Sequence, residues 1–177
     1  MTAERVTESE RLTRKRRIDP RLKAWGWEIT PFDADRPLTA YRRHAIEEYP
    51  TANGPADYAL VVDGILVGVV EAKKVTLGPQ NVLTQAERYS KGIDGSTLDF
   101  NGYHAPFLYS TNGEVLWFQD ARNKLNRSRK IAGFHTPDAL REMLARDLDA
   151  NCKWFHKNPN QHPRLRPYQW RAQRQRR

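Results

Sequence analysis

The sequence predicts an α/β fold in which helices flank a mixed central β-sheet. Two strongly apolar segments joined by Asp63-Gly64 are typical of a β-hairpin. Helical patterns precede, interrupt and follow the predicted strands, as in a layered α/β domain. The chain has 177 residues, about one domain, and its 38% hydrophobic content excludes a wholly disordered protein.

The opening segment is predicted to be helical. Asp19-Pro20 can restart the helix as a cap and first turn, and Gly26 is a typical helix stop. Residues 25–30 then lead into a strand. The pattern that follows is mixed, and a short helix around 40–48 is the one element expected there.

The hairpin strands are predicted at residues 58–62 and 65–70. The second segment is apolar throughout, which is typical of a central strand that is covered on both faces. A later pair of strands has a similar pattern, with strands at 107–110 and 115–118 and a turn at Asn112-Gly113.

Two further helices complete the prediction. One covers about 79–91, with Pro79 in its first turn and Gly92 beyond its end. The other begins at the Thr136-Pro137-Asp138 cap and reaches about Ala150.

Basic residues outnumber acidic residues, with 30 Lys and Arg against 21 Asp and Glu and a net charge of +9. Such an excess favours a polyanion partner, because phosphate contacts release condensed counterions. Each basic cluster alone is equally consistent with a solvated helix face or an ordinary tail. The clusters lie at residues 11–17, 122–130 and 164–177.

Other compositional features favour a cytoplasmic protein. Cys152 is the single cysteine, which excludes an internal disulfide framework and fits a reducing compartment. The histidines form no zinc-ligand pattern with it. No apolar run approaches the roughly 20 residues that span a bilayer, and no secretion signal is recognisable at the N-terminus. We therefore expect no membrane partner.

An acid and a base emerge together where the second hairpin strand ends. Glu71 and Lys73 are two residues apart and point to the same side of the strand. Asp57 can join them only if the hairpin register allows it. A two-residue turn at Asp63-Gly64 would pair Asp57 with Val70, turn it to the opposite face and rule out the site.

We therefore predict a three-residue loop over residues 62–64, with a bulge that pairs Val61 with Ile65. Asp57 then lies diagonal to Glu71 on the same face, roughly 7 Å away. Two carboxylates this close repel each other unless a cation lies between them.

Mg²⁺ suits such a pair, because it accepts one or two carboxylates together with water and phosphate oxygens. It lowers the pKa of a bound water and neutralises charge on a phosphate. Lys73 would hold or activate that water and stabilise the transition state. The spacing leaves a structural alternative open, in which Asp57 caps a turn and Glu71 pairs with Lys73 or Lys74.

Asp57-Tyr58, the apolar hairpin and Glu71-Ala72-Lys73 resemble the core of the PD-(D/E)XK nucleases. The stretch from Ala56 to Lys74 is similar to the N-terminal nuclease domain of type I restriction enzyme R (motor) subunits, with Pro55 displaced by one residue from the family's Pro-Asp pair. The resemblance covers about residues 8–150 and implies a restriction-endonuclease-like α/β core.

The resemblance implies a metal-dependent DNA endonuclease that hydrolyses phosphodiesters with metal-activated water. Asp57 and Glu71 would be metal ligands, joined by the Ala72 carbonyl, and Lys73 would position the water or act as an electrophile. Glu10 matches an acidic residue of the opening helix that can support the metal site. The implied metal is Mg²⁺, with Mn²⁺ as a substitute.

Two further motifs match the same family. Gln85 and Tyr89 fit its Gln-x-x-x-Tyr motif, lie one helical turn apart and would contact the DNA backbone or brace the site. Thr111-Asn112-Gly113 matches a turn that follows a later strand of the same domain.

Leu165–Gln169 resembles the segment that opens superfamily 2 helicase motors, where an aromatic residue and a Gln approach the adenine of ATP. No phosphate-binding Gly-Lys-Thr/Ser loop follows, so ATP is expected only for a motor domain that this chain lacks. The predicted domains are a nuclease-like domain at 1–150 and a linker with the start of a helicase domain at 151–177. The chain would be a fragment, a split gene product or a remnant of a larger enzyme.

The resemblance also implies double-stranded DNA as the substrate and methyltransferase and specificity subunits as partners. Two other functions stay open. One is a non-catalytic DNA-binding or assembly module with a vestigial acidic pair. Binding of a divalent metal ion that weakens in Asp57→Ala would argue against this module. The other is a repair or recombination nuclease of the same fold, against which the helicase-like segment argues.

Overall fold

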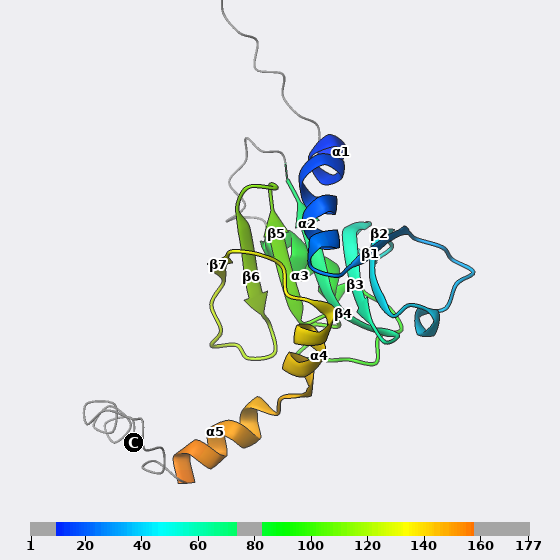
Figure 1. The fold of residues 1–177 in the computed structure, drawn as a ribbon. Coiled ribbons are helices and arrows are strands. Elements are labelled where there is room, and N and C mark those ends of the chain that lie inside the picture. The colour runs from blue at the N-terminus through cyan, green and yellow to red at the C-terminus, as the bar shows by residue number, and fades with distance from the viewer. Residues whose placement is uncertain (1–9, 74–82, 158–177) are drawn as a thin grey trace, which may run out of the picture. The chain divides into compact units, whose positions relative to one another are not determined.

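A seven-stranded mixed sheet is the centre of the structure, a computed structural model that describes residues 10–73 and 83–157 (Figure 1). The strands lie in chain order across the sheet. The first two strands are parallel to each other, as are the fourth and fifth, and all other neighbours are antiparallel. The strands are β1 (Glu28–Pro31), β2 (Arg43–Tyr49), β3 (Ala56–Val62), β4 (Ile65–Ala72), β5 (Phe107–Thr111), β6 (Leu116–Asp120) and β7 (Arg129–Ile131).

Helices cover both faces of the sheet. Tyr58 of β3 contacts α2 through a hydrogen bond, whereas its neighbour Ala59 packs with Tyr89 of α3. Because successive strand residues point to opposite faces, α2 and α3 lie on opposite sides. The helices are α1 (Glu10–Thr13), the π-helical η1 (Arg14–Ile18), α2 (Asp19–Ala24), the 3₁₀ helix η2 (Leu38–Ala40), α3 (Leu83–Lys91), α4 (Pro137–Ala145) and α5 (Leu148–Lys157).

The chain divides into two compact units, residues 1–142 and 143–177. All seven strands belong to the first unit, and α5 belongs to the second. The predicted α/β class with a mixed central sheet is confirmed. The domain boundary at residue 150 stays a prediction, because the helicase-like segment 165–169 lies outside the described residues. No helix within the described ranges is long and apolar enough to cross a membrane.

The segment predicted as a short helix around 40–48 is in fact strand β2. This strand lies inside the sheet, between β1 and β3, and its central residues His44, Ala45 and Ile46 are all buried. A strand covered on both faces lacks the alternation of apolar and polar residues that marks a half-buried strand. The prediction failed because this pattern is absent.

The last predicted helix is two helices. Thr136 caps α4 as expected, since its side chain accepts the Ala139 amide hydrogen at 3.1 Å. The helix ends at Ala145, and Asp147 then caps α5 by accepting the Ala150 amide hydrogen at 2.8 Å. A second N-cap residue within the predicted span therefore separates the two helices.

The other helix predictions agree with the structure where it describes them. α2 begins at Asp19, and Gly26 follows its end with a φ of 86°. α3 matches the described part of the helix predicted at 79–91. Residues 79–82 lie outside the described residues.

The β3–β4 hairpin turns in two residues, not in the predicted three-residue loop. Asp63 and Gly64 have φ values of 48° and 81°, and Val62 pairs with Ile65. Two successive left-handed residues are the signature of a type I′ turn, whose twist matches that of the flanking strands.

A β-bulge corrects the register further along the hairpin. Val61 pairs with Leu66, but Leu60 pairs with Gly68, so Val67 is an extra residue in β4. The predicted pairing of Val61 with Ile65 is therefore wrong. The extra residue sits inside β4 instead of in the turn.

The bulge brings Asp57 to the face that carries Glu71. Beyond the bulge Tyr58 pairs with Val70, and continuing this register by one residue sets Asp57 opposite Glu71. Residues opposite each other in an antiparallel pair point to the same face. The predicted shared face therefore holds, although its cause is the bulge and the two residues are direct neighbours, not diagonal ones.

Candidate active site

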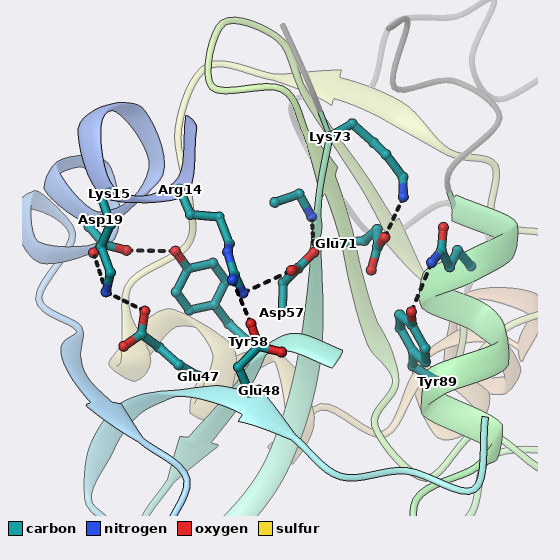
Figure 2. Close-up of polar contacts among 12 residues, drawn as sticks. Arg14, Lys15, Asp19, Glu47, Glu48, Asp57, Tyr58, Glu71, Lys73 and Tyr89 are labelled. Carbon is teal, nitrogen blue, oxygen red and sulfur yellow. Dashed lines mark hydrogen bonds and ion pairs between the residues drawn. The ribbon is translucent and has the colours of Figure 1, made fainter. Parts of the chain in front are cut away.

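Asp57 is bound to the main chain of β4, the strand that carries Glu71 and ends just before Lys73. Its Oδ2 atom accepts the Ala72 amide hydrogen at 2.7 Å (Figure 2). Asp57 is the second residue of β3 and Ala72 is the last residue of β4, so this bond closes the open end of the hairpin. The predicted acidic pair is therefore brought together at one end of two adjacent strands.

Glu71 and Lys73 form an ion pair at the same strand end. Lys73 Nζ lies 2.6 Å from Glu71 Oε1, and the two side chains are 16% and 4% exposed. This is the pairing that the structural alternative expected. It also sets an ammonium group beside the acidic pair, as a catalytic arrangement requires.

Arg14 is a further member of the site. One of its guanidinium nitrogens, Nη1, donates to Asp57 Oδ1 at 2.9 Å, and the other, Nη2, lies 2.5 Å from Glu48 Oε1 (Figure 2). Each carboxylate oxygen of Asp57 therefore accepts one hydrogen bond. The donors come from two elements that are far apart in the sequence, η1 and the end of β4.

Burial raises the pKa of Asp57 above its ordinary value. The Ala72 amide and the Arg14 guanidinium oppose this shift, while the negative charge of Glu48 adds to it. The pKa of Arg14 is itself raised, because its two acidic partners outweigh the effect of burial. The ionised form of Asp57 is therefore disfavoured by burial and stabilised by a neighbouring cation.

A second polar network fixes the helical segment to the sheet. The Tyr58 hydroxyl donates to Asp19 Oδ1 at 2.6 Å, and Lys15 Nζ bridges Asp19 Oδ2 and Glu47 Oε1 (Figure 2). Burial raises the pKa of Tyr58, and the hydrogen bond to Asp19 raises it further. The hydrogen bond to Glu47 raises the pKa of Lys15.

The first basic cluster is therefore largely engaged within the molecule. Arg14, Lys15 and Arg17 all form ion pairs with acidic residues, whereas Arg11 and Arg16 are exposed. The expectation of an open polyanion-binding face at 11–17 is not met by these three side chains. The physical reason is that η1 packs against acidic strand ends.

Gln85 and Tyr89 lie on one face of a helix, as their spacing predicts, and they contact each other. Gln85 Nε2 donates to the Tyr89 hydroxyl oxygen at 2.8 Å on one face of α3 (Figure 2). Burial raises the pKa of Tyr89, and the nearby charges of Glu71 and Asp57 add to the shift. The motif therefore lies beside the acidic pair.

Sequence reasoning missed Glu48 and the inward role of Arg14. Glu48 has a left-handed φ of 54°, which is uncommon for a residue other than glycine. The sequence carries no signal for this conformation. The sequence assigned Arg14 no role beside Asp57, because an ion pair between residues 43 positions apart cannot be read from spacing.

The donor atoms fit a hard divalent cation only in part. In residues 10–73 and 83–157, no three His, Cys, Asp or Glu side chains gather as a metal-binding group. Asp57 and Glu71 offer two carboxylates, and Mg²⁺ commonly completes such a set with water and phosphate oxygens. The side chain of Glu10, the first residue of α1, lies outside the described residues, as does Lys74.

Comparison with known proteins identifies relatives of one kind. Residues 32–144, more than half of the chain, match a family described as the second domain of the type I restriction enzyme EcoKI endonuclease subunit. The chain is 29% identical over 191 residues to the type I restriction enzyme EcoKI endonuclease subunit of Escherichia coli (strain K12). This match covers 80% of the chain and 16% of that protein.

A solved structure has a similar fold. It is described as a fragment of an HsdR subunit of a type I restriction enzyme from Vibrio vulnificus YJ016. The TM-score is 0.52 at 24% sequence identity, over 78% of this chain and 26% of the solved one. The chain therefore spans a small part of both relatives, and the likeness in structure supports the restriction-endonuclease-like fold.

Proposed function

Because the chain belongs to the family of type I restriction enzyme endonuclease subunits, we propose that it contains the nuclease centre of such a subunit. The reaction would be hydrolysis of a DNA phosphodiester by a metal-activated water. The observation that carries this proposal is the joining of Asp57 to the end of β4, beside Glu71 and Lys73, through the Ala72 amide.

Asp57 and Glu71 would hold Mg²⁺, or Mn²⁺ in its place. The Ala72 carbonyl is a third candidate, since the N–H and C=O of one strand residue point to the same side and its N–H already faces Asp57. Glu10 stays a candidate supporting ligand. A bound Mg²⁺ supplies a water of lowered pKa and neutralises charge that develops on the phosphate.

Lys73 would orient the attacking water and stabilise the negative charge that builds up on the phosphate. Its ammonium group is a compact point charge with three donors, which suits both tasks. The ion pair with Glu71 holds this group at the strand end. Gln85 and Tyr89 would brace the site or contact the DNA backbone, since their hydrogen bond fixes both side chains on α3.

Double-stranded DNA is the proposed substrate, and methyltransferase and specificity subunits are the proposed partners. The DNA sequence would be read by the specificity subunit, so this chain would contact mainly the phosphate backbone. ATP would serve only the motor domain of a complete subunit. The proposed compartment is the cytoplasm, where the single cysteine stays reduced.

A second function, a non-catalytic DNA-binding or assembly module, is favoured by one observation. Both Asp57 oxygens accept protein hydrogen bonds, and Glu71 pairs with Lys73, so the acidic pair is satisfied by the protein itself. In that case the pair would serve stability alone. Metal binding separates the two functions.

The test is nicking of supercoiled plasmid at low salt with Mg²⁺ or Mn²⁺, with Mn²⁺ binding measured on the same preparations. Nicking by the wild-type chain is expected to disappear in Glu71→Gln. The matched control is Glu114→Gln, which removes an exposed carboxylate in a turn. Nicking that survives Glu71→Gln would overturn the nuclease proposal. Absence of both nicking and metal binding would favour the non-catalytic module.

A further inference from the structure

We propose that Arg14 is a resident cation on Asp57 that must shift to Glu48 before a divalent metal ion binds. Arg14 and Glu48 would then set the metal affinity of the site together. This inference rests on the proposed function, because it assumes that Asp57 is a metal ligand. It adds a pair of positioning residues on η1 and β2.

The guanidinium of Arg14 lies between two carboxylates. It contacts Asp57 through Nη1 at 2.9 Å and Glu48 through Nη2 at 2.5 Å. Its side chain is 14% exposed, whereas that of Glu48 is 52% exposed. The buried end of this bridge is therefore Asp57, and the solvent-facing end is Glu48.

A metal ion at Asp57 would compete with Arg14. Oδ2 of Asp57 is bound to the Ala72 amide, which leaves Oδ1 as the oxygen that the guanidinium occupies. Mg²⁺ binds carboxylate oxygens at about 2.0–2.1 Å, so it would bring two positive charges next to the Arg14 nitrogen. Like charges at such short range repel strongly, and the guanidinium would have to move.

Glu48 provides a place for the displaced guanidinium. Its neighbours Glu47 and Tyr49 pair with Tyr58 and Ala56, so Glu48 lies opposite Asp57 in the β2–β3 register. Its left-handed φ of 54° is maintained although such a conformation is unfavourable for glutamate. Strain of this kind at a polar contact is typical of functional sites. Arg14 can thus leave Asp57 without losing its other partner.

The backbone of the helical segment is held while the guanidinium moves. The next residue, Lys15, bridges Asp19 and Glu47. The movement would therefore be a side-chain rotation, and the shift would leave the fold unchanged.

The test is a double-variant cycle of Mn²⁺ affinity, measured on the 177-residue chain at pH 8 by electron paramagnetic resonance. Arg14→Gln is expected to tighten Mn²⁺ binding by roughly tenfold, because the competing cation is lost. Glu48→Gln is expected to weaken binding by a similar factor, because the guanidinium loses its second partner and stays on Asp57. Arg17→Gln is the matched control, since Arg17 lies on the same segment and pairs with Glu114.

The double variant identifies the mechanism. If Glu48 acts through Arg14, the double variant binds Mn²⁺ as tightly as Arg14→Gln. If Glu48 acts only through its charge, it weakens binding equally in both backgrounds, and the inference is overturned. Unchanged or weaker binding in Arg14→Gln overturns it as well.

A second measurement on the wild-type chain tests the inference even if the Arg14→Gln variant fails to fold. The side-chain ¹⁵N resonance of Arg14 is expected to shift on titration of the wild-type chain with Mg²⁺, and not to shift in Asp57→Asn. A resonance that does not respond while Mg²⁺ binds overturns the inference. If Mn²⁺ binding is lost in Asp57→Asn but is unaffected by Arg14→Gln, this inference alone is overturned. If neither the wild-type chain nor any variant binds Mn²⁺, the proposed function is overturned too.

Discussion

The Tyr58 hydroxyl donates a buried hydrogen bond of 2.6 Å to Asp19 Oδ1, which joins β3 to the first residue of α2. Tyr58 directly follows Asp57, so this bond holds the helical segment against the strand that carries the site. Because the acceptor is a carboxylate, the bond is of the strong, charge-assisted kind.

Tyr58→Phe is therefore expected to lower the free energy of unfolding by about 1.5–3 kcal/mol, as measured by urea denaturation. Tyr41→Phe is the matched control, because the buried Tyr41 hydroxyl has no hydrogen-bond partner among the described residues. Removing that hydroxyl should be neutral or stabilising. Equal losses in both variants would contradict the role assigned to the Asp19 bond.

Asp57 makes stability depend on pH in a defined direction. Its folded-state pKa is raised above the ordinary 3.8, so its contribution to stability is full below that value and lost as the pH rises through the folded pKa. The Asp57→Asn variant has no carboxyl group at this position, so it does not lose this stability as the pH rises. The free energy of unfolding of the variant, minus that of the wild type, should therefore increase between pH 4 and pH 7.

Urea denaturation at several pH values measures this difference. Asp63→Asn provides the baseline for a surface carboxylate, because it lies in the exposed turn and asparagine tolerates a left-handed φ. A difference that stays constant or decreases with pH would show that burial does not dominate at Asp57.

Gly68 allows β4 and β5 to approach closely beside the bulge. A Cβ atom at this position would lie 2.6 Å from the Phe107 carbonyl oxygen, a backbone atom of a buried strand. Gly68→Ala is expected to destabilise the fold by about 1–3 kcal/mol, as seen in thermal unfolding.

Gly133→Ala is an instructive comparison. Its Cβ would lie 2.3 Å from a ring carbon of Trp25, which is closer still, but Trp25 is 42% exposed and can rotate away. A smaller loss at Gly133 than at Gly68 is therefore expected. The reverse order would mean that the backbone between β4 and β5 adjusts readily.

Lys73→Ala is expected to abolish the nicking activity proposed above. The substitution also takes the ammonium group from Glu71, whose side chain is almost fully buried. Breaking a buried ion pair by removing one partner is strongly destabilising. Glu71→Gln/Lys73→Ala should therefore be more stable than Lys73→Ala, and neither should cut DNA. Nicking at the wild-type rate by Lys73→Ala would remove Lys73 from the mechanism.

Much of the site could be predicted because it depends on local patterns. The apolar segments around Asp63-Gly64 defined two adjacent strands, and their ends brought Asp57 and Glu71 together. The spacing of Gln85 and Tyr89 placed both on one face of a helix, where they contact each other. These features follow from strand and helix periodicity within short stretches.

The remainder depends on contacts between distant segments. Asp-Gly determines the two-residue turn, but the bulge lies further along the hairpin, beside Gly68, where the distant Phe107 approaches closely. Likewise, Arg14 reaches Asp57 only because η1 packs beside β3. Spacing along the chain does not report such tertiary contacts, which is why the place of the bulge and the role of Arg14 were missed.

The bulge at Val67 gives the hairpin one spare residue. Residues on the two sides of Val67 pair with adjacent residues of β3, so deleting it would leave an uninterrupted ladder with Asp57 still opposite Glu71. Inserting one residue between Gly64 and Glu71 would shift the register by one residue and turn Glu71 to the other face. The hairpin should therefore tolerate shortening by one residue at this position, but not lengthening by one.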